Sequence, residues 1–241
     1  MQHLLHPSVP SRKEFAKLYF GNRVIAIVKE LLGLNLYDPN SEEKIVMEVL
    51  NLLVSPSGEK DFELPWHRDG IAENVDACDE KRQLNEKSPG GRQSHVQYNI
   101  ALSDADESLL VIPGSHRRVR TDIERNASPY EFDLPDQVAI KMKAGDAVFY
   151  DDNILHRLVL RGINLNHGDV GTMTLHGSVG RYGHADERAK KVLRHGVGEW
   201  IDSPQAPFDE LQGKCRARAE GMRSRLVEMG QRAEVEYALD D

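Results

Sequence analysis

Two histidines and one aspartate have the spacing that a metal site requires. His67 and Asp69 flank Arg68 in the chain. Residues i and i+2 of a strand point to the same face, so His67 and Asp69 would converge on one ion while Arg68 points away. His156 follows a turn and an apolar strand within residues 144–150. That order places His156 at a strand end or in a loop, from which it would complete the set.

Two histidines and one carboxylate on one face leave further coordination positions of a metal open. This is the ligand set of non-haem Fe(II) oxygenases, in which the open positions hold a cosubstrate and O2. The chain has ten histidines, and we expect most of them to be structural or exposed. A lone H-x-D pair is also common by chance. The carboxylate beside His67, and the turn and strand ahead of His156, raise these two above that background. We therefore predict His67, Asp69 and His156 as metal ligands and as the catalytic centre.

Many short strands between two terminal helices are predicted to position these residues. Apolar runs bounded by turn residues indicate strands at residues 45–54, 64–69, 94–102, 109–112, 138–142, 147–150 and 171–179. Helical spacing predicts an N-terminal helix over about 13–33 and an amphipathic C-terminal helix over about 207–239. The pattern is typical of a mainly β fold with flanking helices, either a barrel or a double-sheet jelly roll.

Residues 70–92 form a long polar segment directly after the first two proposed ligands. A loop of this length inside a compact domain is usually functional or disordered. We predict a loop here, with two interpretations left open: a lid over the site, or a solvated segment.

Composition limits the functions that the chain can serve. It has 241 residues, 39% hydrophobic and 29% charged, with a formal net charge of −8, which suits one soluble domain over residues 1–241. The acidic balance argues against nucleic-acid binding, and no apolar run is long enough to span a membrane. Cys78 and Cys215 lie far apart, and residues 1–10 have no secretory pattern. We expect a reduced, cytoplasmic protein, and leave a homo-oligomer open.

The chain resembles the phytanoyl-CoA dioxygenase (PhyH) family of 2-oxoglutarate-dependent oxygenases over roughly residues 45–180. The matching pieces, in the family's order, are Trp66-His67-Arg68-Asp69, Asn99-Ile100-Ala101-Leu102-Ser103-Asp104, Val111-Ile112-Pro113-Gly114-Ser115-His116-Arg117, Ala144-Gly145-Asp146 and His156. The resemblance implies a double-stranded β-helix (cupin-like jelly-roll) core over about 45–180. It also implies Fe(II), 2-oxoglutarate and O2 as reactants. Pro113-Gly114 is interpreted as a turn, and His116 is not predicted as a ligand.

The cosubstrate site departs from the family's pattern. The family has an arginine about ten residues after the distal histidine, which pairs with the far carboxylate of 2-oxoglutarate. Here Thr172 stands near that place, with Arg161 too early and Arg181 too late. Two groups of residues are therefore the candidates for binding 2-oxoglutarate: Gln97 and Asn99, whose strand touches it in the family, and Thr172, Thr174 and His176, which would share one face of the last strand.

The resemblance implies hydroxylation, desaturation or rearrangement of a substrate, with release of succinate and CO2. We expect this substrate to be a small organic metabolite, although the family name also allows an acyl-CoA. Related halogenating enzymes have a small residue at the position of Asp69, so a carboxylate there argues for these reactions and against halogenation. Two alternatives stay open, the first because of the missing arginine and the second because the same three ligands would suit it. One is a catalytically silent jelly roll that binds a metal or ligand. The other is a cupin-like metalloenzyme that does not use 2-oxoglutarate.

Overall fold

A computed structural model describes residues 2–58, 60–87, 94–104, 106–163, 171–183 and 186–232 of the chain. The strands are β1 (Gln2–His3), β2 (Ile45–Val54), β3 (Phe62–His67), β4 (His95–Ala101), β5 (Leu109–Val111), β6 (Val138–Ala139), β7 (Ala147–Asp151), β8 (His156–Leu160) and β9 (Met173–Arg181). The helices and helical turns are α1 (Arg12–Tyr19), α2 (Asn22–Leu31), η1 (Pro39–Lys44), α3 (Ala77–Lys87), η2 (Ser115–Arg117), α4 (Asp122–Asn126), α5 (Asp186–Val192), η4 (Leu193–Val197) and α6 (Gly213–Arg232).

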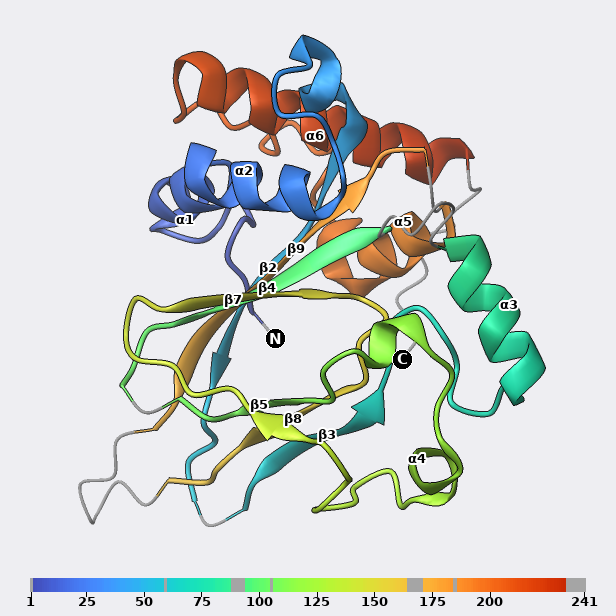
Figure 1. Ribbon diagram of the computed structural model, residues 1–241. Coiled ribbons are helices and arrows are strands. Elements are labelled where there is room, and N and C mark those ends of the chain that lie inside the picture. The colour runs from blue at the N-terminus through green and yellow to red at the C-terminus, as the bar shows by residue number, and fades with distance from the viewer. Residues whose placement is uncertain are drawn as a thin grey trace. The chain divides into compact units, whose positions relative to one another are not determined.

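The strands form two sheets. One has five strands in the order β1-β2-β9-β4-β7, and the other has four in the order β3-β8-β5-β6. The pairs β3–β8, β8–β5 and β5–β6 of the smaller sheet are antiparallel, and Figure 1 shows β3, β8 and β5 side by side. The predicted fold class, a mainly β jelly-roll core with flanking helices, is confirmed.

The chain divides into two compact units. Unit 1 comprises Met1–Asn51, Arg92–Val96 and Gly177–Asp241, and unit 2 comprises Leu52–Gly91 and Gln97–His176. The single domain over residues 1–241 stays a prediction. No helix of the described residues is long and apolar enough to cross a membrane.

Unit 2 contains the whole four-stranded sheet and every residue of the candidate site. Alternation along the strands sends one set of side chains into its interior. Leu109 and Val111 pack there with Tyr150 and Ile154. A second cluster in unit 2 brings Leu53 together with Leu158 and Leu160. These apolar side chains support the strands that carry the polar residues of the site.

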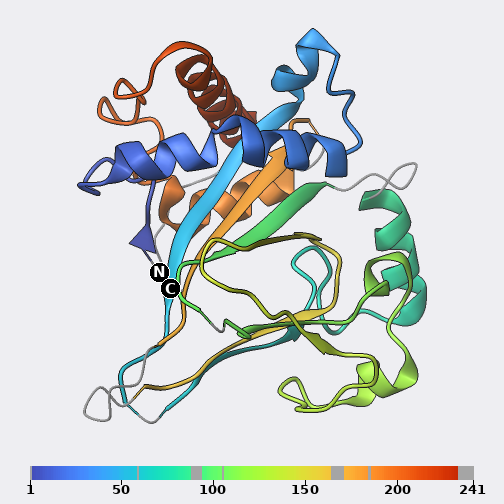
Figure 2. The same cartoon turned by 60° about the vertical axis from the view of Figure 1, so that its left-hand side comes forward.

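In unit 1, helices from both ends of the chain pack against β2 and β9. Figures 1 and 2 show α1 and α2 in blue and α6 in red beside β2 and β9. The buried Tyr19 hydroxyl donates to the Ser178 carbonyl at 2.5 Å and accepts from the Glu48 backbone N–H at 2.9 Å. From α6, Arg225 donates to the Ile45 carbonyl at 2.7 Å. These contacts tie helices α1 and α6 to β2 and β9.

The single N-terminal helix predicted over residues 13–33 is two helices, because the chain breaks at Gly21. A Cβ at this position would lie 2.7 Å from the Lys17 carbonyl oxygen, closer than van der Waals contact allows. Glycine therefore lets the end of α1 and the start of α2 pack closely. The C-terminal helix is α6, Gly213–Arg232, and residues 233–239 of the predicted range lie outside the described residues.

The loop predicted over residues 70–92 contains a helix, α3. The Asp76 carboxylate accepts from the Asp79 backbone N–H at 2.8 Å, which is the contact of a helix N-cap. Glu80 in the first turn is fully buried. The inward contacts of this helix are ionic rather than apolar. Apolar periodicity does not detect such contacts, so the sequence pattern predicted a loop.

An ion-pair cluster in unit 1 should make the stability depend on pH. Burial raises the pKa of Glu42, but hydrogen bonds from Arg218 and Lys29 outweigh it and hold that pKa at about 2. A depressed pKa contributes stability above the unfolded value of 4.5, and the contribution is lost as pH falls toward 2. We expect Glu42→Gln to lower the free energy of unfolding at pH 7 by about 1–2 kcal/mol, a figure discounted because the Glu42 side chain is 37% exposed.

Urea unfolding of both proteins between pH 7 and pH 2 measures this difference. It should shrink below pH 4.5 and vanish near the bottom of the range. Glu14→Gln, in an exposed pair with Lys17, is the control and should cost little at any pH. A Glu42→Gln deficit that stays constant down to pH 2 would contradict the assignment.

Candidate metal centre

A bulge in β3 places the two histidines opposite each other. Leu64 pairs with Leu158, but His67 pairs with His156, so β3 uses three steps where β8 uses two. An extra residue in one strand shifts every later side chain to the other face. Without the bulge His67 would point out of unit 2, whereas with it both imidazoles lie on the inner face as cross-strand neighbours. Their ring centroids are 4.3 Å apart.

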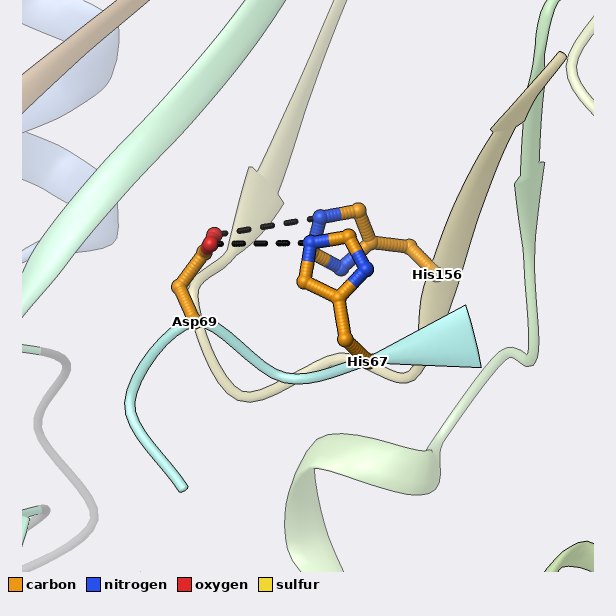
Figure 3. A group of neighbouring side chains, drawn as sticks. All are labelled: His67, Asp69 and His156. Atoms are coloured by element: carbon orange, nitrogen blue, oxygen red, sulfur yellow. Dashed lines mark ion pairs between the residues drawn. The ribbon is translucent and has the colours of Figure 1, made fainter. Parts of the chain in front are cut away.

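Asp69 joins them from the bend after β3. Its backbone N–H donates to the Asp152 carbonyl at 3.2 Å. Its two carboxylate oxygens lie 3.7 Å from Nε2 of His67 and 3.8 Å from Nε2 of His156, as the dashed lines in Figure 3 mark. The predicted convergence of His67 and Asp69 is present, but a bend after the strand produces it rather than alternation within a strand.

Backbone carbonyls hold both imidazoles with Nε2 toward the aspartate. Nδ1 of His67 lies 2.6 Å from the Pro65 carbonyl oxygen, and Nδ1 of His156 lies 2.9 Å from the Ile154 carbonyl oxygen. A carbonyl only accepts, so each Nδ1 carries a proton, and in the neutral imidazole each Nε2 is then the atom with the lone pair. The hydrogen bond at Nδ1 fixes the orientation and the tautomer of each imidazole, as is usual for histidines that bind a metal through Nε2.

The electrostatics favour a neutral ligand nitrogen on His156. Burial lowers the pKa of His156 below its usual value, so its Nε2 is unprotonated at neutral pH, the form that binds metals. The side chains of His67 and Asp69 are 23% and 25% exposed, which leaves an approach to the group from one side.

The two carboxylate–imidazole pairs have the spacing that donors to one divalent transition metal require. Their donor atoms all lie within 4.8 Å of one another. Two donors at about 2.1 Å from one ion are at most about 4.2 Å apart, and both carboxylate–imidazole distances fall below that limit. Among the described residues this is the one group of three or more His, Cys, Asp or Glu side chains that could hold a metal ion.

Three polar side chains, those of Gln97, Asn99 and His176, extend from the candidate ligands, and we call them the polar wall. The Gln97 amide donates to the Asp69 carboxylate. Farther along β4, Oδ1 of Asn99 accepts from Nδ1 of His176 at 2.9 Å and from the Tyr150 hydroxyl at 3.5 Å. Burial raises the pKa of Tyr150 far above its usual value, so its hydroxyl stays protonated and donates. The structure thus brings Gln97, Asn99 and His176 together beside the candidate ligands.

The two threonines predicted to bind 2-oxoglutarate have other contacts in the structure. The Thr174 hydroxyl donates to the Asp106 carboxylate, and both residues are fully buried. Thr172 precedes β9, donates its backbone N–H to the Ser55 hydroxyl at 3.0 Å, and lines a surface groove with Arg157. Since Arg157 follows His156 in β8, its side chain lies on the opposite face of the sheet from the ligand.

Thr174→Val tests whether Thr174 holds a structural contact or a ligand. The substitution keeps the shape but removes the hydrogen bond to the buried Asp106 carboxylate, whose other oxygen accepts from Ser108. An unsatisfied buried acceptor costs about 1–3 kcal/mol, and more when charged. We expect a loss of about 2–3 kcal/mol in urea unfolding and an unchanged affinity for 2-oxoglutarate in equilibrium dialysis with Fe(II). A normal stability with weakened 2-oxoglutarate binding would contradict this.

The turn predicted at Pro113-Gly114 is present, and Gly114 has the positive φ of 79° that favours glycine. The next residue, Ser115, is buried and accepts from the Leu155 backbone N–H at 2.7 Å. The motif therefore supports the segment just ahead of His156. Sequence reasoning missed this role, and it also missed Tyr150, Asp106 and Glu80, because no local pattern marks a long-range hydrogen bond.

Comparisons with known proteins agree with the resemblance. A model of the phytanoyl-CoA dioxygenase (PhyH) family matches residues 1–157. Comparison of the sequence with curated proteins found no match.

Among solved structures, the non-heme monooxygenase ThoJ in a Ni complex is 15% identical, over 74% of this chain and 57% of that one, with a TM-score of 0.46. The epimerase SnoN in complex with Fe3+, alpha ketoglutarate and nogalamycin RO is 18% identical, over 70% of this chain and 59% of that one, with a TM-score of 0.44. HygX from Streptomyces hygroscopicus, with nickel, 2-oxoglutarate and hygromycin B bound, is 14% identical, over 73% of this chain and 68% of that one, with a TM-score of 0.46. The chain thus spans less than two thirds of the length of ThoJ and SnoN.

Proposed function

Because the chain belongs to the phytanoyl-CoA dioxygenase family, we propose that it is an Fe(II)- and 2-oxoglutarate-dependent oxygenase. Its iron ligands are His67, Asp69 and His156. The reaction is hydroxylation, desaturation or rearrangement of a small organic metabolite, with release of succinate and CO2.

The observation that carries this proposal is the orientation of the two imidazoles. Each Nδ1 is held by the backbone carbonyl two residues earlier in the chain, and both Nε2 atoms lie within 4 Å of the Asp69 carboxylate. Two imidazole nitrogens and one carboxylate would hold an ion and leave its other positions to the reactants, as non-haem Fe(II) oxygenases require. A structural zinc site would instead be closed by a fourth protein ligand.

The chain's own residues hold and orient the reactants. Iron with 2-oxoglutarate and O2 would supply the oxidation of a substrate C–H bond. Gln97 fixes the Asp69 carboxylate through its amide, and the ring of Tyr150 lies against His156 at 5.5 Å between centroids. This packing keeps water away from the buried side of His156, while the exposed side of His67 leaves room for the substrate.

The cosubstrate would bind along the polar wall. Of the residues predicted from the sequence, Gln97, Asn99 and His176 lie together there, and Asn99 with His176 offers both donors and acceptors. We assign the far carboxylate of 2-oxoglutarate to the His176 end of this wall. Thr174 is a poor partner for that carboxylate, because its hydroxyl already serves the buried carboxylate of Asp106.

The test is an anaerobic titration of the Fe(II)-loaded protein with 2-oxoglutarate, followed by the weak visible metal-to-ligand charge-transfer band. We expect a saturable band that needs both reactants. Succinate release in air, screened over candidate metabolites, then identifies the substrate class. Iron binding without a band at any 2-oxoglutarate concentration would contradict the proposed cosubstrate.

A second candidate function follows from the residues at the start of β9. Thr172, which stands near the place of the family's arginine, lines a groove with Arg157, and the Thr174 hydroxyl is bound to Asp106. The alternative is a jelly-roll protein that binds a metal but does not turn over 2-oxoglutarate. Metal binding without any succinate would favour this alternative over the oxygenase.

A further inference from the structure

Arg68 lies between two of the candidate ligands in the chain and points away from them into the protein. It is only 3% exposed, so its guanidinium must find partners inside unit 2. It donates to three backbone carbonyls: to Ser115 at 3.0 Å, to Arg118 at 3.0 Å, and to Asn153. One side chain therefore links the bend after β3 to two other segments of the chain.

Both of those segments support the ligands. Asn153 lies three residues before His156, and the carbonyl of its neighbour Asp152 accepts the Asp69 backbone N–H. Ser115 accepts the Leu155 backbone N–H, one residue ahead of His156. A shift of the Arg68 guanidinium would therefore move the backbone on both sides of the candidate metal site.

The counter-ion of Arg68 comes from α3. The Glu80 carboxylate is fully buried and accepts from Nε of Arg68 at 3.1 Å. Its other oxygen accepts from the backbone N–H of Arg120 at 3.1 Å and from Nη2 of Arg125 at 2.5 Å. Figures 1 and 2 show α3 beside the segment that carries these arginines. Removing one partner of a buried pair leaves an uncompensated charge, so Glu80 holds Arg68 in place.

We propose that Arg68 and Glu80 are positioning residues for the metal ligands, and that α3 acts on the candidate metal site through this buried pair. The inference rests on the proposed function, because it requires that His67, Asp69 and His156 bind a metal. In this proposal α3 supplies the negative charge of Glu80. That charge holds the Arg68 guanidinium in place, and Arg68 in turn holds the two segments that support the ligands.

The experiment measures Mn(II) affinity without 2-oxoglutarate, from the EPR signal of free Mn(II), for Arg68→Lys and Glu80→Gln. Lysine keeps the charge but cannot bridge several carbonyls as the guanidinium fork does. Loss of a residue that orients metal ligands typically costs about 10- to 100-fold in affinity. We expect a weakening in that range for Arg68→Lys and about 10-fold for Glu80→Gln.

Arg125→Gln is the matched control. It also breaks an ion pair with Glu80 and a bond to the Val75 carbonyl, but it touches neither ligand-bearing segment. We expect its melting temperature to fall like those of the test variants while its Mn(II) affinity stays within about threefold of the wild type. A purely structural role of Arg68 would give the same affinity in all folded variants.

The outcomes separate this inference from the proposed function. If the wild type fails to bind Mn(II), or His156→Ala binds equally well, the metal site itself is wrong. If the wild type binds, His156→Ala does not, and folded Arg68→Lys matches the wild type, only the positioning role is overturned. If Arg68→Lys does not fold, Glu80→Gln, which keeps an acceptor oxygen for Arg68, decides by the same criterion.

Discussion

His156→Ala should abolish metal loading at micromolar Fe(II) and lower succinate formation by about 10³-fold or more. Loss of a residue that merely orients a metal ligand costs about 10- to 100-fold in affinity, so the loss of a ligand should cost more. His156 is buried at the start of β8, with its Nε2 lone pair directed at Asp69. No neighbouring side chain replaces it among the described residues that could form a metal group.

The measurement is iron content after anaerobic loading and gel filtration, together with the charge-transfer band and succinate release. His6→Ala is the matched control, since His6 belongs to unit 1 and bonds to the Ser8 hydroxyl. It should load and turn over like the wild type. A folded His156→Ala protein that retains stoichiometric iron would show that the group in Figure 3 is not the metal site.

The ligand group could be predicted from the sequence because its residue types are rare in combination and its order along the chain matches one family. Alternation along one strand, however, does not account for the geometry of this group. His67 and His156 face each other only because β3 has a bulge between Leu64 and His67. The bulge turns the His67 side chain inward. A bulge is set by pairing with another strand, and the sequence of one strand does not reveal it.

Other parts of the site depend on contacts between distant residues. Glu80 and Arg68 are twelve residues apart, and the bond from Gln97 to Asp69 spans twenty-eight. Thr174 and His176 lie two residues apart within β9, whereas Thr172 lies just before the strand, which begins at Met173, and lines a groove with Arg157. Hydrophobic periodicity locates strands, but it does not identify which buried polar groups find each other.

Asp69→Asn should weaken metal binding by about 10²-fold or more, although it keeps the shape of the side chain. The substitution removes the negative charge that faces both imidazoles at 3.7 and 3.8 Å. A neutral amide oxygen binds a divalent cation less strongly than a carboxylate, because the Coulomb attraction is lost in a partly buried site. The Mn(II) titration used for Arg68 measures this loss directly.

Asp69→Glu and Gln97→Leu separate charge from placement. Glutamate keeps the charge but moves the carboxylate by about one methylene, and a misplacement of about 1 Å can cost about 10²-fold in rate; we expect near-normal metal loading with slow succinate release. Gln97→Leu removes only the amide that donates to Asp69 and should weaken metal binding by about 10-fold. The expected order of metal affinity is therefore wild type, Asp69→Glu, Gln97→Leu and Asp69→Asn. An Asp69→Asn protein that binds Mn(II) as well as Gln97→Leu does would mean that Asp69 assists the site from outside instead of coordinating the metal.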